Sequence, residues 1–296
     1  MGQIKKDRFI YSIGGIIFSL ESDFPVTAEK RFFTEGLSCP ADRNDILSVR
    51  ITSCLRAYSK IDKIFSLQRT NLYTTEEGYL QEFYSTDDKK DLLWTVAVNR
   101  TFSQFEYVLH PHQDGRVFPV TDPYGSVSGI FLLQHSFINR QGIIIHAVGG
   151  SIQGKGIAFA APSGTGKSTL GRLLLHSPEN RLFSEDRLIV RSMNDQWHLW
   201  GTPWYGEGDI ARNESAPLAA FIFLRQSKKN KINKLSSSDG LPRLLQTVSI
   251  PWYSEEWTSK GLALCELLLR DIPVFEFAFM PNQTAVQAVE RFAAEL

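Results

Sequence analysis

The nine residues from Ala161 to Thr169 constrain the fold more than any other stretch of the chain. Their sequence is Ala-Pro-Ser-Gly-Thr-Gly-Lys-Ser-Thr, between an apolar run at 156–160 and a leucine-rich run at 170–175. Strand, glycine-rich turn and helix, in this order, form the context that a phosphate-binding loop requires. Glycines let backbone N–H groups converge on an anion, and the first turn of the helix adds further donors. The stretch therefore predicts a nucleotide-phosphate site.

Each residue of this loop has an expected role. We expect the nucleotide contacts to come from Ser163, Gly164, Thr165, Gly166, Lys167, Ser168 and Thr169. The Lys167 ammonium would reach the β- and γ-phosphates of ATP, and the Ser168 hydroxyl would ligate Mg²⁺. Ala161 departs from the usual pattern, which begins with glycine, and alanine fits there only if its φ angle is negative. The alternative is a chance glycine-rich turn, and the flanks on both sides weigh against it.

A pair of acidic residues, Glu185 and Asp186, ends the apolar segment that follows the loop helix. Phosphoryl transfer needs a phosphate cradle, a metal ion and a group that positions or deprotonates the acceptor. One carboxylate would hold Mg²⁺ and the other would take the proton, since adjacent residues on an extended segment point to opposite sides. A solvated turn is the alternative interpretation of the same two residues.

Two further residues are candidates for the same site. His146 lies near the end of an apolar strand at 142–148, which we expect to pair antiparallel with the strand that feeds the loop. It could touch a phosphate or the acceptor, although a lone histidine on an apolar strand is more often a core residue. Glu207 lies in a loop rich in glycine and aromatic residues. It is a candidate metal or acceptor contact, with a plain structural turn as the alternative.

The N-terminal part of the chain reads as β-rich and carries no catalytic pattern. We expect an N-terminal domain at 1–120 that selects the acceptor, and a catalytic domain at 121–296. A Gly-Gly hairpin is expected at 9–20 and a helix at 124–138. We expect a turn at 149–156. Further expected elements are strands at 45–51, 63–67, 79–84, 92–98, 105–110 and 218–224, a hairpin over 194–195, and helices at 241–248, 258–270 and 284–295.

Charge and cysteine content exclude several classes of protein. The 296 residues include 32 Lys and Arg against 32 Asp and Glu, so we expect neither nucleic-acid nor membrane-surface binding. No apolar run approaches the roughly 18 residues of a membrane helix. The three cysteines are widely spaced, which argues against a disulfide framework or a zinc site. We therefore expect a cytoplasmic protein, with homo-oligomerisation left open.

Five stretches carry a resemblance to a known family: Ile145-His146-Ala147, the loop at 162–169, Glu185-Asp186, Gly201-Thr202-Pro203-Trp204 and Ala216-Pro217-Leu218. Together they resemble the catalytic domain of HPr kinase/phosphorylase, over about 140 to 280. They look most like HPr-kinase-related proteins, including kinases found beside peptide-modification operons. The resemblance implies a mixed α/β fold with a β-rich P-loop kinase core, similar to that of phosphoenolpyruvate carboxykinase.

The resemblance also implies roles for single residues. Asp186 matches the family's catalytic aspartate, Glu185 stands where its first aspartate usually is, and His146 matches a histidine close to the phosphates. Gly201 follows Trp200 instead of the arginine of the family's signature, so phosphorylase activity and HPr recognition do not follow. The expected activity is ATP- and Mg²⁺-dependent transfer of the γ-phosphoryl group to a Ser or Thr hydroxyl of a protein or peptide. The alternatives are a small-molecule kinase and a nucleotide-binding regulator without turnover.

Overall fold

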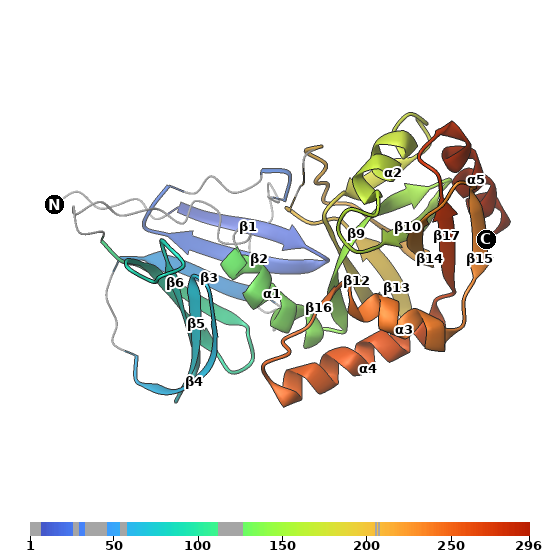
Figure 1. Ribbon diagram of the computed structural model, residues 1–296. Helices are drawn as coiled ribbons and strands as arrows, with labels where there is room; N and C mark the ends of the chain where they lie inside the picture. The colour runs from blue at the N-terminus through green and yellow to red at the C-terminus, as the bar shows by residue number, and fades with distance from the viewer. Residues whose placement is uncertain are drawn as a thin grey trace. The chain divides into compact units, whose positions relative to one another are not determined.

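The computed structural model describes residues 7–25, 30–32, 46–53, 58–111, 127–204, 206 and 208–296. The chain divides into two compact units, Met1–Ser136 and Phe137–Leu296. Each unit is built around its own β-sheet, and the fold is mixed α/β with many strands and few helices (Figure 1). None of the described helices is long and apolar enough to cross a membrane.

The N-terminal unit is an eight-stranded sheet with the order β1-β2-β3-β8-β7-β6-β5-β4. The predicted hairpin is confirmed, because β1 and β2 pair antiparallel over Gly14 and Gly15, whose φ angles of 58° and 72° suit a tight turn. The elements are β1 (Asp7–Ile13), β2 (Ile16–Ser22), the 3-10 turn η1 (Lys30–Phe32), β3 (Leu47–Thr52), β4 (Lys60–Leu67), β5 (Thr70–Thr75), β6 (Gly78–Tyr84), β7 (Leu92–Asn99), β8 (Gln104–Leu109) and the helix α1 (Val127–Ile138).

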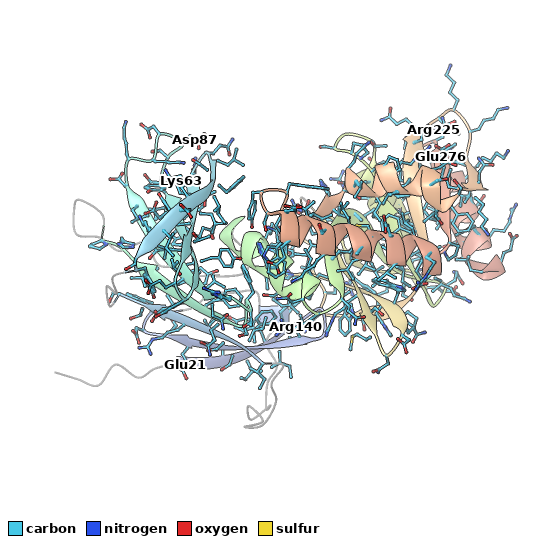
Figure 2. The ribbon with its side chains drawn as sticks, turned by 90° about the horizontal axis from the view of Figure 1, so that it is seen from below. Glu21, Lys63, Asp87, Arg140, Arg225 and Glu276 are labelled. Atoms are coloured by element: carbon cyan, nitrogen blue, oxygen red, sulfur yellow. The ribbon has the colours of Figure 1, made fainter. Side chains whose placement is uncertain are left out.

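Strand β5 was not predicted, because part of what it buries is polar. Asn71 is buried and donates to Glu82 of β6 (3.2 Å), and Glu82 also pairs with Lys60 of β4. Burial alone would raise the pKa of Glu82, but hydrogen bonds from Lys60 and Tyr84, among others, lower it to about 2. A strand held by such a network lacks the apolar alternation that identifies a half-buried strand in a sequence. Figure 2 labels Lys63 of β4 and Asp87, which lies between β6 and β7.

The C-terminal unit holds a nine-stranded sheet whose main path is β10-β9-β12-β13-β14-β17-β15. An additional parallel pairing of β10 with β14 closes five of these strands into a ring. The elements are β9 (Gly142–Ile152), β10 (Lys155–Ala160), α2 (Lys167–Leu174), β11 (Arg181–Ser184), β12 (Arg187–Met193), β13 (Gln196–Trp200), β14 (Ser215–Gln226), β15 (Lys231–Lys234), α3 (Ser237–Leu245), β16 (Val248–Ser249), α4 (Glu255–Asp271), β17 (Val274–Phe279) and α5 (Gln283–Glu295).

The helices of this unit form two pairs. Helices α3 and α4 lie together on one side of the strands, and α2 and α5 lie on the other (Figure 1). The apolar cluster beneath α2 and α5 includes Leu170 and Val286, packed with Phe159 of β10. Glu276 of β17 accepts from Arg225 of β14 at 3.0 Å, a pair labelled in Figure 2. This core fixes the strand ends from which the candidate site is built.

The antiparallel pairing of β9 with β10 is confirmed, but the predicted turn at 149–156 is wrong. Strand β9 continues to Ile152, and the turn is confined to Gln153 and Gly154. The sequence predicts Gly150 as a turn residue, but in the structure the absence of a side chain at Gly150 allows the backbones of β9 and β11 to approach closely. A Cβ atom there would lie 2.1 Å from the backbone oxygen of Arg181. Glycine in a strand interior often marks such a close approach between backbones.

Most other predicted elements of the unit are confirmed, with shifted ends. Helix α3 begins at Ser237, several residues before the predicted start, and its N-cap Ser236 accepts from the Asp239 N–H at 3.1 Å. The hairpin over Asn194 and Asp195 is confirmed as β12 and β13. The two-residue strand β16 was not predicted, because two residues are too few to carry a periodic pattern.

Candidate functional site

The glycine-rich loop leaves β10 at Ala161 and enters α2 at Lys167, as the sequence predicted. Ala161 is buried and does not adopt a positive φ angle, so alanine is acceptable at the first position of the loop. Gly164 and Gly166 have φ angles of 78° and 106°, which favour glycine. The backbone conformation therefore explains why glycine stands at these two positions and is not needed at 161.

Three contacts fix the loop. The Thr165 hydroxyl donates to the Pro162 carbonyl at 2.9 Å, and Gln226 at the end of β14 donates to the Gly164 carbonyl at 3.2 Å. A Cβ atom on Gly166 would lie 3.1 Å from the Phe279 ring of β17. The loop thus contacts two neighbouring strands, β14 and β17. Because it is already ordered, ligand binding loses less free energy to ordering the loop.

The donors around this loop suit an oxyanion such as a phosphate group. Helix α2 has Gly166 as its N-cap and no side chain that caps it, so its first-turn N–H groups lack intrahelical acceptors. Ser168 and Thr169 are exposed at the same helix end. A Cβ atom on Gly164 would have no atom within 4 Å, so space lies open beside the loop backbone.

Lys167 is the one charged side chain of the loop. It is only 6% exposed, and its ammonium donates to the carbonyls of Ala161 (2.8 Å) and Pro162 (3.2 Å). Burial lowers the pKa of Lys167, and the charge of Asp186 partly offsets this effect. Lysine and the predicted catalytic aspartate therefore lie close enough to influence each other electrostatically.

The acidic pair lies between two strands that pair one after the other with the same edge of β9. Strands β11 and β12 both run antiparallel to β9 along one edge, and Glu185 and Asp186 fall between them. On the other edge of β9, β10 ends opposite Ala147, and β16 begins opposite Ile145. The N–H of His146 donates to Thr247 on this edge. His146 therefore lies where the partners of β9 change.

Asp186 lies between two basic side chains. One carboxylate oxygen is 3.5 Å from His146 Nε2, and the other is 3.5 Å from Arg187 Nε. Burial lowers the pKa of His146, and the charges of Lys167 and Arg187 lower it further, whereas Asp186 opposes the shift. The lowered pKa favours the neutral form of the His146 imidazole. Lys167, His146 and Asp186 thus form one electrostatically coupled group beside the start of the loop.

The Glu185 carboxylate contacts a different part of the chain from the Asp186 carboxylate. Glu185 is 4% exposed, and its carboxylate accepts the backbone N–H of Gly208. A Cβ atom on Gly208 would lie 2.6 Å from this carboxylate, so the backbone at Gly208 packs tightly against it. The two acids contact different groups, and they lie in a bend between β11 and β12 and not on an extended strand. Glu207, the other predicted metal contact, lies outside the described residues.

Arg187 and Ser249 are site residues that the sequence did not indicate. Arg187 pairs with His146 across β12 and β9, and its guanidinium donates to the Ser249 hydroxyl of β16 at 3.3 Å. The backbone carbonyl of Arg187 accepts from the Thr202 hydroxyl at 2.7 Å. The only sequence signal was the position of Arg187 directly after the acidic pair. Within the described residues, no group of three or more His, Cys, Asp or Glu side chains could hold a metal ion.

Comparisons with known proteins add two findings. A family model described as SynChlorMet cassette protein ScmC matches residues 126–263, somewhat less than half of the chain. The solved structure of the Hpr(Ser) kinase/phosphatase from Coxiella burnetii is similar at 13% sequence identity and a TM-score of 0.32, covering 51% of this chain and 88% of that one. No curated protein matches the chain.

Proposed function

We propose that this chain is an ATP-dependent kinase that phosphorylates a Ser or Thr hydroxyl of a peptide or protein. The observation that carries the proposal is that Asp186, 3.5 Å from His146 Nε2, lies near Lys167, whose ammonium donates to the Ala161 carbonyl where the glycine-rich loop leaves β10. An anion cradle beside a lysine and a half-buried aspartate provides the parts that phosphoryl transfer requires. The resemblance in the sequence to HPr-kinase-related proteins supports the same reaction class.

The chain's own groups would divide the work. The first-turn N–H groups of α2 and the Lys167 ammonium would hold the phosphates, and the Ser168 hydroxyl would be a ligand for Mg²⁺. Asp186 would accept the proton of the acceptor hydroxyl, because its carboxylate is 34% exposed in the side chain and lies beside the loop. His146, whose Nε2 lies 3.5 Å from Asp186, would orient that carboxylate. ATP with Mg²⁺ would supply the phosphoryl group and screen its negative charge.

The remaining acid of the pair has a different proposed role. Glu185 is 4% exposed and its carboxylate accepts the Gly208 N–H. We therefore propose that Glu185 positions the backbone at Gly208, and metal ligation by Glu185 stays a proposal from the sequence alone. Glu207 stays a proposed metal contact from the sequence alone.

Labelled ATP tests the proposal directly. The full chain is incubated with Mg²⁺, γ-labelled ATP and a library of Ser- and Thr-containing peptides, and transfer is followed by mass spectrometry. Asp186→Asn should lower transfer at least about 100-fold, the effect of losing a general base, while nucleotide binding persists. Lys167→Ala should weaken nucleotide binding itself. Asp195→Asn is the matched control, since Asp195 is exposed in the β12–β13 turn.

The outcomes separate the alternatives. Transfer that survives in Asp186→Asn would show that the base is misassigned. Transfer only to small hydroxyl compounds would make the protein a small-molecule kinase. Nucleotide binding without any transfer would favour a regulator, and unchanged binding in Lys167→Ala would contradict the role of the loop.

A further inference from the structure

An open surface cavity of about 340 Å³ lies on one face of the eight-stranded sheet of the N-terminal unit. Its lining includes Ser48 and Arg50 of β3 and Gln104 and Glu106 of β8. Ser48 is in register with Gln104, and Arg50 with Glu106, so these four polar side chains form two adjacent rows on one face. The volume is at the lower end of the range for small-molecule sites.

Several polar groups of this cavity are already bonded within the unit. The Tyr58 hydroxyl donates to the Glu106 carboxylate at 2.5 Å. The Thr75 hydroxyl accepts the Gly78 N–H at 3.0 Å. The side-chain oxygen of Asn99 accepts two backbone N–H groups, at 2.9 and 3.1 Å. These groups shape the cavity and have little hydrogen-bonding capacity left for a ligand.

Three other side chains are uncommitted. In the part of the chain that the structure describes, Ser48, Arg50 and Gln104 have no side-chain hydrogen bond or ion pair. A guanidinium, a hydroxyl and a carboxamide all donate, and they lie side by side on two neighbouring strands. A planar guanidinium fork matches a carboxylate in two parallel hydrogen bonds. The free donors of this cavity therefore fit an oxyanion.

The charge around these donors favours a carboxylate over a phosphate. Glu77 and Glu106 also line the cavity, and their negative charges oppose a dianion more strongly than a monoanion. The remaining lining includes Ala97 and the ring of Tyr79, which contacts Phe102 at a centroid distance of 5.1 Å. The cavity thus offers one carboxylate position beside apolar surface, as a short peptide segment requires.

We propose that this cavity binds a carboxylate of the peptide or protein acceptor, with Arg50 as the anchoring residue. The identity of the ligand as the acceptor rests on the proposed kinase function. The carboxylate comes either from an Asp or Glu side chain or from the C-terminus of the peptide. Holding the acceptor on the chain that carries the loop raises its effective concentration at the site.

Binding of short peptides to the full chain tests this site without ATP or Mg²⁺. The first probe is Ac-Gly-Phe-Asp-Gly-Gly-NH₂, and its control replaces Asp by Asn. A third probe, Ac-Gly-Phe-Gly-Gly-Gly-OH, carries only a C-terminal carboxylate, and N-acetylglycine represents a small carboxylate. Affinities are measured by calorimetry for the wild type, Arg50→Gln and Arg69→Gln. Arg69 is an exposed arginine outside the lining of the cavity, paired with Asp87.

We expect the wild type to bind at least one carboxylate peptide about tenfold more tightly than the Asn peptide, as one charge-assisted hydrogen bond predicts. Arg50→Gln should lose this preference, and Arg69→Gln should keep it, with unchanged circular dichroism in both variants. The Asp and C-terminal probes tell the two carboxylate sources apart. Equal binding of all peptides, no binding, or a preference that survives in Arg50→Gln overturns the proposal. N-acetylglycine binding as tightly as the best peptide overturns the assignment to a peptide.

Failure of this site and failure of the kinase proposal are distinguishable. A carboxylate preference without phosphoryl transfer would support the cavity as a binding site and contradict the kinase proposal. Phosphoryl transfer without a preference for carboxylate peptides would support the kinase proposal and contradict the cavity as its acceptor site.

Discussion

Two glycines with the same backbone conformation provide a controlled test of the glycine-rich loop. Gly164 lies in the loop, and Gly154 lies in the β9–β10 turn; both are exposed, and both have a φ angle of 78°. A Cβ atom at either position would have no atom within 4 Å. Alanine therefore meets no steric obstacle at either site, and the only cost is the left-handed backbone, about 1–2 kcal/mol.

The two alanine variants should be alike in stability and unlike in binding. Gly154→Ala and Gly164→Ala both fall in the C-terminal unit, whose melting temperature should drop by roughly 2–8 °C in each. In Gly164→Ala the loop relieves part of its strain by relaxing, and binding must then restore the conformation that directs N–H groups at a phosphate. We expect about tenfold weaker nucleotide binding, since tenfold corresponds to about 1.4 kcal/mol.

Titration with a fluorescent ATP analogue in the presence of Mg²⁺ measures this difference. Gly154→Ala should bind within about a factor of two of the wild type, because its strain affects folding alone. Equal affinities in the two variants would refute the assignment of the loop to phosphate binding. A wild-type melting temperature in Gly154→Ala would instead refute the estimate of the strain.

Three further predictions concern single side chains. Arg187→Gln should lower the turnover number about tenfold with little change in nucleotide affinity, because it removes a group that holds Asp186; an unchanged turnover number would contradict this positioning role. The lowered pKa of His146 means that the unfolded chain binds a proton more readily, so wild-type stability should fall as the pH drops below about 6.5. Urea midpoints of His146→Gln should fall less steeply there, and parallel curves would exclude the effect. Glu82, with its pKa of about 2, should contribute about 3 kcal/mol that is present above about pH 4.5 and lost toward pH 2. Acid unfolding of Glu82→Gln should therefore lack this step in the N-terminal unit.

The sequence predicted what depends on local pattern. The loop between an apolar strand and a helix, the β12–β13 hairpin and the β9–β10 pairing all follow from periodicity and turn residues over short distances. The residues that complete the candidate site depend on long-range contacts instead. Arg187 meets Ser249 only because β16, a two-residue strand, pairs with β9. The sequence predicts a turn at Gly150, and only the fold reveals the neighbouring backbone at Arg181.

The change of partners along β9 has a consequence for how this protein can diversify. At His146, β10 gives way to β16 on one edge, and the ladder is interrupted at Glu185 and Asp186 on the other. The segments that meet there are connected to the sheet separately, so a substitution in one does not shift the register of another. The stretch around Ser249 can therefore change in sequence while the loop after β10 keeps its conformation.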